Sequence, residues 1–240
     1  MFYWIFKNMD FNRWQCANGM EVLWLSGPAE CRISDASSYI VDLAKETYLE
    51  VQHSVLYFFC STAPREIPIA ITFVSTVVCQ LVRCSPELKQ EITTIFLRTL
   101  LDKIFVEEPL SKPKVPLFKT DDSAEVIVKK ILKASSNAYW AALRAVTEAV
   151  TDIEQEKGLT LIIDGLEKAK HQEYEFIREL CVFVEHLQER PSAARALLTS
   201  RPQAEIEGIL GQLPYANIEY DGERKGLTRP ISFSPGKQGS

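Results

Sequence analysis

The segment with the clearest chemical potential is residues 27–34, which read Gly-Pro-Ala-Glu-Cys-Arg-Ile-Ser. It follows a short apolar run and precedes a segment of helical spacing. A phosphate-binding loop in that position reads G-x-x-x-x-G-K-[ST], in which the glycines let backbone N–H groups surround phosphate and the hydroxyl binds Mg²⁺. Gly27 and Ser34 match the pattern, whereas Arg32 and Ile33 replace the second glycine and the lysine. The candidate nucleotide-binding residues are Gly27, Pro28, Ala29, Glu30, Cys31, Arg32, Ile33 and Ser34.

A second chemical segment is Leu-Ile-Ile-Asp-Gly-Leu-Glu at residues 161–167. A carboxylate that ends an apolar strand is a typical ligand for Mg²⁺, directly or through water. Asp164 and Ser34 are therefore the candidate metal ligands. Glu167 is the acid nearest to the place where a water-activating group would stand.

The third segment is Leu-Leu-Thr-Ser-Arg-Pro at residues 197–202. An arginine at the end of a strand can stabilise the outer phosphate of a nucleotide, because its planar guanidinium matches phosphate geometry. We therefore take Arg201, together with Glu167, as the candidate catalytic pair.

The elements that must position these loops alternate between two kinds. Short apolar runs closed by turn residues predict buried strands, at residues 22–25, 55–60, 159–163, 195–199 and 217–220. Between them, helical spacing predicts helices, at residues 34–50, 67–82, 86–105, 123–135, 138–157, 172–189 and 203–211. This alternation predicts an α/β fold with a parallel sheet of about five strands between two helical layers, as in a P-loop NTPase core. The three chemical loops should then meet at the carboxyl edge of the sheet.

Composition narrows the classes of function. The chain has 240 residues, 46% of them apolar, and a net charge of −5, which predicts no binding to nucleic acid or to an anionic membrane. Its six cysteines form no C-x-x-C pair, and its longest apolar stretch, residues 67–82, is shorter than the ~20 residues of a membrane span. We expect a reduced, cytoplasmic protein. The three histidines, His53, His171 and His186, share no spacing and are not expected to bind metal.

The domain organisation follows from the same pattern. Residues 1–20 show no period and predict a lead-in segment, residues 21–220 a single NTPase-like domain, and residues 221–240, rich in Gly, Pro, Ser and Lys, a disordered tail. The three prolines within residues 107–122 predict a loop.

Taken together, the three loops resemble those of the NACHT-like branch of the STAND class of signalling NTPases, including its fungal members and the nephrocystin-type N-terminal modules. In that family the loops typically read Gly-Pro-Pro-Gly-Cys-Gly-Lys-Ser, Ile-Asp-Gly-Leu-Asp-Glu and Thr-Ser-Arg-Pro. The resemblance covers roughly residues 14–228. It implies a signalling role in fungal innate immunity or self-recognition, ATP or GTP with Mg²⁺ as cofactor, and other protein domains or NACHT-like subunits as partners, with oligomers allowed.

The departures from the family pattern concern the residues that hold phosphate. Glu30, Arg32 and Ile33 stand where the family has Gly, Gly and Lys, so the Walker A loop is degenerate, and Lys168 stands where the family has its catalytic Glu. A non-glycine residue in a left-handed conformation costs about 1–2 kcal/mol. Ile33 supplies no cation, and Glu30 would repel a triphosphate. The sequence therefore predicts weak or absent nucleotide binding, with no hydrolysis.

Several alternatives stay open at this point. Arg32 could serve as the missing cation, Ser34 could be only a helix N-cap, and Arg201 could simply pair with a surface acid. Asp164 could be only a polar strand end. For the whole chain, the alternatives to a non-hydrolysing signalling or scaffold module are a working ATP or GTP switch and a truncated fragment with no separate activity. A further alternative is that the chain takes no cofactor.

Overall fold

The computed structural model describes residues 3–16, 21–47, 53–62, 67–103, 124–153, 158–169, 174–189, 194–219 and 227–229. These residues belong to two compact units. One comprises Met1–Ala63 with Glu154–Ser240, and the other is Pro64–Ile153. The residues expected to form one domain, 21–220, are thus divided between the units, and the middle of that range forms a unit of its own.

The first unit is built on one sheet with the order β2-β3-β4-β1-β5-β6. Its strands are β1 (Glu21–Ser26), β2 (His53–Phe59), β3 (Gly158–Asp164), β4 (Ala194–Ser200), β5 (Tyr215–Glu219) and β6 (Leu227–Arg229). β1 to β5 are parallel neighbours, which confirms the predicted five-stranded parallel sheet. β6 pairs antiparallel with β5. The sequence did not predict this short strand, which falls in the segment expected to be a disordered tail.

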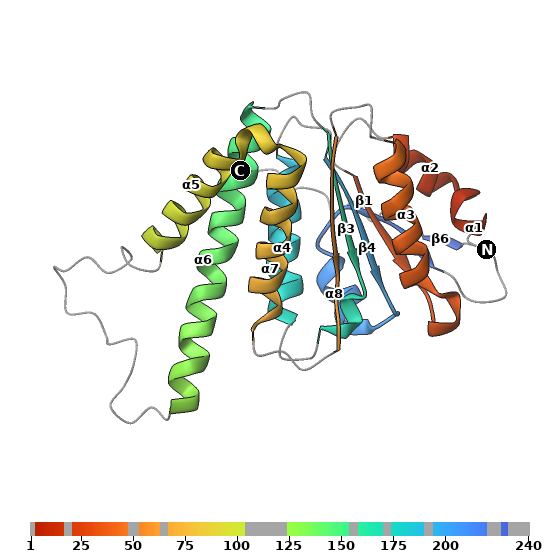
Figure 1. The fold of residues 1–240 in the computed structure, drawn as a ribbon. Helices are drawn as coiled ribbons and strands as arrows, with labels where there is room; N and C mark the ends of the chain where they lie inside the picture. The colour runs from red at the N-terminus through yellow and green to blue at the C-terminus, as the bar shows by residue number, and fades with distance from the viewer. Residues whose placement is uncertain are drawn as a thin grey trace, which may run out of the picture. The chain divides into compact units, whose positions relative to one another are not determined.

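Helices cover both faces of this sheet (Figure 1). On one side lie α1 (Tyr3–Phe6), α2 (Met9–Cys16) and α3 (Ile33–Thr47), and on the other α7 (Tyr174–Gln188) with α8 (Ala204–Leu210). α7 buries apolar residues at helical spacing, from Phe176 to Leu187. β3 and β4 are buried along their whole length, as central strands covered on both faces should be. The predicted three-layer α/β fold is confirmed.

The second unit is helical. It contains α4 (Ile69–Cys84), the 3₁₀ turn η2 (Pro86–Leu88), α5 (Lys89–Leu101) and α6 (Ala124–Ile153). The prediction of two helices over residues 123–157 was wrong, because α6 is continuous. Its middle, Ala-Ser-Ser-Asn at residues 134–137, lowers helix propensity but contains neither Gly nor Pro to break the helix. The ring centroids of Trp140 and Phe73 lie 5.3 Å apart, and those of Tyr139 and Phe96 lie 5.7 Å apart. The helix α6 therefore packs on both α4 and α5.

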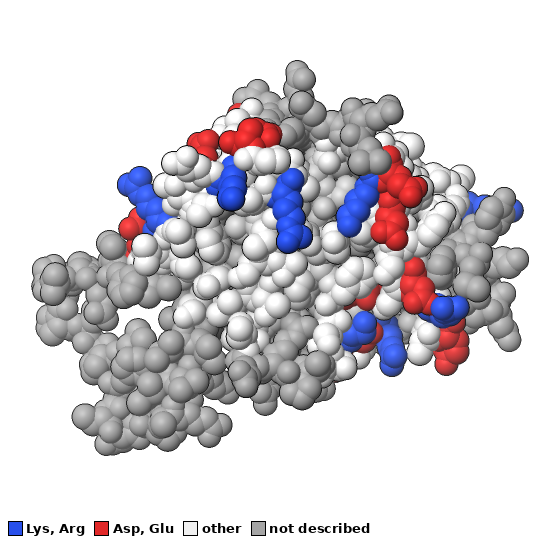
Figure 2. Space-filling view, viewed as in Figure 1, with Lys and Arg blue, Asp and Glu red and all other residues white. Residues whose placement is uncertain are grey.

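No single helix within the described ranges is long and apolar enough to cross a membrane. The pair Ile69–Cys84 and Pro86–Leu101 passes that test jointly by length and composition, with a bend of 113° between the two parts. On the face shown in Figure 2, several Lys and Arg side chains are separated by uncharged surface, and Asp and Glu side chains lie beside others. The expectation that the chain binds neither nucleic acid nor membrane stays a prediction.

Some predicted features lie outside the described residues. These are the loop at 107–122, His171, and residues 221–226 and 230–240 of the expected tail. The lead-in at residues 1–20 holds the helices α1 and α2, in which Phe11 and Trp14 are buried.

Candidate functional site

The three predicted loops meet at the carboxyl ends of β1, β3 and β4. Backbone hydrogen bonds continue the ladder beyond the strands, because Gly27 donates to Ser200 O at 3.4 Å and Gly165 donates to Thr199 O at 3.1 Å. Between the loops lies a pocket of about 300 Å³. It is lined by Gly27, Pro28, Ala29, Arg32, Ile33, Ser34, Asp35, Asp164, Gly165, Glu167, Lys168, Thr199, Ser200 and Arg201.

The pocket thus gathers most of the predicted site residues, but Glu30 and Cys31 are not among the lining residues. Both belong to the 3₁₀ turn η1 (Ala29–Cys31), where Glu30 is exposed and Cys31 is partly buried. Burial, and then the neighbouring Glu30 carboxylate, raise the pKa of the Cys31 thiol. Glu30 is thus exposed and does not line the pocket, and the expected repulsion of a triphosphate by Glu30 stays a prediction.

The phosphate loop carries the backbone strain that its sequence predicts. Arg32 has φ 51° and ψ 43°, and it is the single non-glycine residue with positive φ within the described ranges. A glycine adopts this conformation without penalty, whereas a side chain costs about 1–2 kcal/mol. Arg32 therefore occupies the position for which the pattern requires its second glycine.

Two backbone N–H groups of the same loop form hydrogen bonds within the turn η1. The N–H of Cys31 donates to Pro28 O at 3.1 Å, and the N–H of Arg32 donates to Ala29 O at 3.3 Å. In a working loop the backbone N–H groups point at the phosphates. These two donors are already engaged inside η1, so the cradle has fewer of them to offer.

Three further predictions about the loop concern Ile33, Ser34 and Arg32. Ile33 is buried and belongs to the apolar cluster under α3, so it supplies no cation to the pocket. Because α3 begins at Ile33, Ser34 lies in the first turn of the helix rather than at its N-cap. The guanidinium of Arg32 lies 2.5 Å from the carboxylate of Asp35, so the candidate substitute cation already faces an acid.

Asp164 is the most buried charged residue of the pocket, with 1% of its surface exposed. Its Oδ1 accepts hydrogen bonds from Ser37 Oγ at 2.9 Å and from Thr199 Oγ1 at 2.7 Å. Thr199 Oγ1 in turn accepts from the N–H of Gly165 at 3.2 Å. Asp164 is therefore the centre of an ordered network rather than a simple polar strand end.

Sequence reasoning missed Ser37 and Thr199, although a signal for each was present. Ser37 follows Ser34 by three residues, which places both on one face of α3. Thr199 precedes the Ser200-Arg201 pair at the end of β4, beside the strand that carries Asp164. A carboxylate this deeply buried requires several donors, so a search for neighbouring hydroxyls would have found them.

Lys168 lies between the two predicted metal ligands. Its Nζ is 3.5 Å from Asp164 Oδ2 and 3.4 Å from Ser34 Oγ. Mg²⁺ requires oxygen ligands at about 2.0–2.1 Å in octahedral geometry. An ammonium that contacts both oxygens competes for the same lone pairs and repels a second cation. Among the described residues no group of three or more His, Cys, Asp and Glu side chains is gathered for a metal. With Lys168 in this position, the residues do not fit Mg²⁺.

The two predicted catalytic residues face each other across the pocket. Glu167 Oε2 accepts a hydrogen bond from the N–H of Arg201 at 3.2 Å. The Nε of Arg201 lies 3.8 Å from Glu167 Oε1. Arg201 is 60% exposed, so this pair is solvent-screened. The alternative that Arg201 pairs with an acid is thus realised, and the acid is the other candidate catalytic residue.

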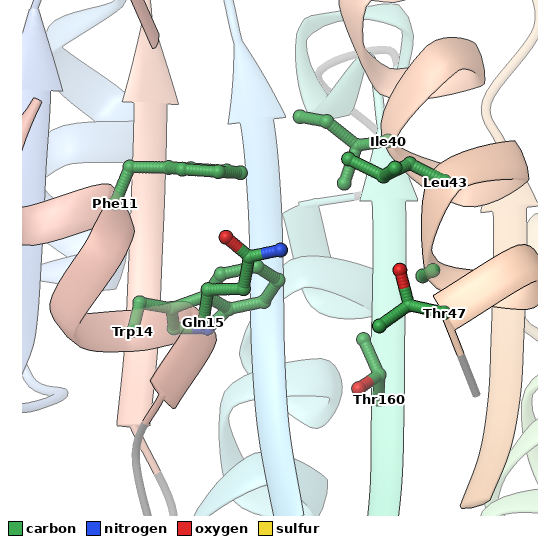
Figure 3. A pocket seen from close by; sticks show the side chains of 8 residues that line it. Phe11, Trp14, Gln15, Ile40, Leu43, Thr47 and Thr160 are labelled. Carbon is green, nitrogen blue, oxygen red and sulfur yellow. The ribbon is translucent and has the colours of Figure 1, made fainter. Parts of the chain in front are cut away.

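A second, much smaller cavity lies between α2, α3 and β3 (Figure 3). Phe11, Trp14, Ile40 and Leu43 line it, with Thr160 on the strand. Its volume is about 10 Å³, which is about the room that a single water needs. It therefore has no space for a nucleotide or another organic ligand.

Polar groups near this cavity are tied to the backbone and to each other. Trp14 Nε1 donates to Ala196 O at 3.0 Å, and the Arg195 guanidinium donates to Gln15 O. His53 Nε2 lies 2.7 Å from Thr160 Oγ1. Burial, and then the nearby Arg195 charge, lower the pKa of His53 to about 4. His53 is therefore neutral at physiological pH, and its role is structural.

Comparison with known proteins points to one family. Residues 1–107 match the family described as Nephrocystin 3, N-terminal. This stretch contains the phosphate loop but not the loops of Asp164 and Arg201, and it covers less than half of the chain. No curated protein matches the chain. The region is thus similar to a nephrocystin N-terminal domain, in agreement with that part of the resemblance drawn from the loops.

Proposed function

We propose that this chain is a NACHT-like P-loop module of the STAND class that binds nucleotide weakly or not at all, does not hydrolyse it, and acts as a signalling or scaffold domain through protein contacts. The observation that carries this proposal is the pairing of charges in the pocket. Each of the three cations that line it, Arg32, Lys168 and Arg201, faces an acid of the same pocket: Asp35, Asp164 and Glu167 respectively.

This pairing weakens the attraction for a nucleotide. A phosphate-binding site works because cations and oriented N–H groups offset the charge of the phosphates. Here a bound triphosphate would have to compete with three carboxylates for the same cations. Ile33, in the position of the usual lysine, is buried in the core and adds no charge.

Hydrolysis is weakened further, because the water-activating group is missing. Lys168 occupies the position of the family's catalytic Glu, and an ammonium cannot accept a proton from water. Glu167 is engaged with the backbone N–H of Arg201. Catalysis of phosphoryl transfer depends on positioning and on charge stabilisation, and this pocket offers little of either.

The cellular part of the proposal rests on likeness rather than on the pocket. The match of residues 1–107 to the nephrocystin family supports the nephrocystin-like part of the proposal. The proposed role as a cytoplasmic signalling module of a fungal innate-immunity or self-recognition type rests on the resemblance of the three loop sequences alone. Its partners would then be other protein domains or NACHT-like subunits, which leaves room for an oligomer.

One observation favours a second candidate, a working ATP or GTP switch with Mg²⁺. The pocket is open and has a volume of about 300 Å³, with Ser34 and Asp164 on its wall. If the paired side chains swing aside when a nucleotide arrives, this volume would accept a phosphate group.

Calorimetric titration with Mg-ATP and with Mg-GTP separates the two candidates. The parent chain should release no heat, whereas Arg32→Gly/Ile33→Lys should gain binding, because it restores the glycine and the lysine of the pattern. Arg32→Gly alone is the matched control, since it removes the strain without adding a cation. Thermal unfolding of each variant checks that Lys at the buried position 33 is tolerated. Micromolar binding by the parent would establish the switch instead.

A further inference from the structure

The cation that balances the buried Asp164 carboxylate belongs to the protein itself. We infer that the Lys168 ammonium takes the place of the divalent metal in this pocket, so that the site needs no Mg²⁺ to balance the charge of Asp164. The inference builds on the proposed function, because it assumes that Ser34 and Asp164 correspond to the metal ligands of a P-loop site.

The first argument is the geometry of the carboxylate. Asp164 Oδ1 is taken by the hydroxyls of Ser37 and Thr199, which leaves Oδ2 for a cation. Lys168 Nζ lies 3.5 Å from Oδ2, and 3.4 Å from Ser34 Oγ. A lysine ammonium carries three donors and a compact charge. It therefore contacts the two oxygens between which Mg²⁺ would lie.

The second argument is that the local backbone holds Lys168 in this place. The turn η4 (Leu166–Lys168) follows Gly165, whose φ is 77°, and the N–H of Lys168 donates to Gly165 O at 2.9 Å. This turn folds the lysine side chain back over the glycine. A Cβ at position 165 would lie 2.8 Å from Lys168 Nζ. Glycine adopts this conformation without strain and leaves the ammonium in its place, whereas a larger residue would be strained at this φ and would require the lysine side chain to shift.

The third argument is electrostatic. Mg²⁺ gives up its water reluctantly and is usually bound with the help of substrate phosphates. Here it would also have to displace a charge of its own sign from an almost fully buried carboxylate. If the ammonium is removed, the buried carboxylate lacks a counter-ion. The vacated place should then accept a divalent metal.

Titration with Mn²⁺, followed by electron paramagnetic resonance, tests this on the full chain without nucleotide. The parent should leave the signal of free Mn²⁺ unchanged. Lys168→Met, which keeps the length of the side chain but removes its charge, should bind one Mn²⁺ per chain at least about tenfold more tightly than the parent. Lys89→Met is the matched control on the exposed start of α5, and it should behave like the parent.

Thermal unfolding gives a second readout. In EDTA, Lys168→Met should melt below the parent, and Mg²⁺ or Mn²⁺ should raise its Tm, whereas the Tm of the parent should not respond to either metal. Lys168→Gln, which keeps a donor to Asp164, is the second variant in case the methionine does not fold. It should show the same gain of metal binding.

Two results would overturn the inference. One is a parent chain that binds Mn²⁺ and loses this binding in Asp164→Asn. The other is a folded Lys168→Met or Lys168→Gln variant that takes up no metal. Neither depends on nucleotide. Tight ATP binding by the parent in EDTA would contradict the proposed weak binding but would leave the metal replacement in place.

Discussion

Two regions of the same unit contain buried polar groups, and they differ in the space that they leave around those groups. Beneath α2 and α3, Phe11 and Trp14 close a cavity with room for about one water (Figure 3). At the carboxyl ends of β1, β3 and β4, the pocket is open, with a volume of about 300 Å³ and charged side chains on its walls. In the first region, large side chains fill almost all of the space. The second region keeps its space, but its cations are paired with acids.

The contrast separates a cavity that is too small for an organic ligand from a pocket that has room for one. Enlarging the small cavity would require the removal of large side chains, because protein interiors are closely packed. The pocket keeps its space, and under the proposed function a few substitutions of its acids should let it bind phosphate. The strongest consequences should come from changes at the centre of this charge network.

The largest effect should come from Asp164→Ala. It leaves the hydroxyls of Ser37 and Thr199 without their acceptor and Lys168 without its counter-ion. Breaking a buried charge pair costs about 3–5 kcal/mol, and because Lys168 is 28% exposed we expect the lower end of that range. Urea unfolding measures it. Asp164→Asn, which keeps an acceptor for both hydroxyls, should lose clearly less. Equal losses would show that the network does not stabilise the fold.

A smaller loss should follow from Gly165→Ala. The new Cβ meets Lys168 Nζ at 2.8 Å, and alanine is strained at φ +77°, so we expect a loss of about 1–2 kcal/mol in the free energy of unfolding. Gly208→Ala in α8 is the control, because a Cβ there meets nothing within 4 Å and alanine is the better helix former. It should stabilise or be neutral. A stable Gly165→Ala variant would mean that Lys168 is free to leave its place.

Some parts of this structure could be predicted from the sequence alone, and others could not. The continuous apolar run before Asp164 predicted the central strand β3, and the altered glycine pattern predicted the left-handed conformation of Arg32. These features depend on neighbours in the chain. The strand β6 could not be predicted, because only its pairing with β5 reveals it.

The charge pairs of the pocket are the part that sequence patterns could not supply. Comparison with the family pattern marked Lys168 only as a missing Glu. Its contact with Ser34 depends on two segments that are 134 residues apart. The absence of Glu30 from the pocket lining was missed for a related reason, since it follows from the turn η1 rather than from the residue type.

His53, near the small cavity, should make the stability of the fold depend on pH. In the folded chain the pKa of His53 is about 4, well below its ordinary value of 6.5, first because of burial and then because of Arg195. The unfolded chain therefore binds the proton more readily between these two values. Stability should be full above pH 6.5 and fall as the pH drops toward 4. Chemical unfolding at several pH values measures this, and in His53→Gln that part of the loss should disappear. If the stability of His53→Gln depends on pH in the same way as that of the parent, His53 does not cause this dependence.

The smallest effect should be a gain. Arg32→Gly removes the left-handed strain, and it loses the exposed ion pair with Asp35. Such pairs contribute about 0–1 kcal/mol, so we expect a net stabilisation of about 0.5–1 kcal/mol, seen as a higher Tm. Arg32→Ala is the control, because it loses the same ion pair but keeps the strain. If both variants lose stability equally, the left-handed conformation carries no cost.

The most direct test of the central claim is to release the paired cations and measure nucleotide binding. Asp35→Asn/Glu167→Gln removes the acids that face Arg32 and Arg201 but leaves the loop and Lys168 unchanged. In calorimetric titration with ATP at low salt, this variant should bind at least about tenfold more tightly than the parent, a difference of about 1.4 kcal/mol. Equal affinity of the two proteins, or micromolar binding by the parent, would contradict the claim that the pocket is silenced by its own carboxylates.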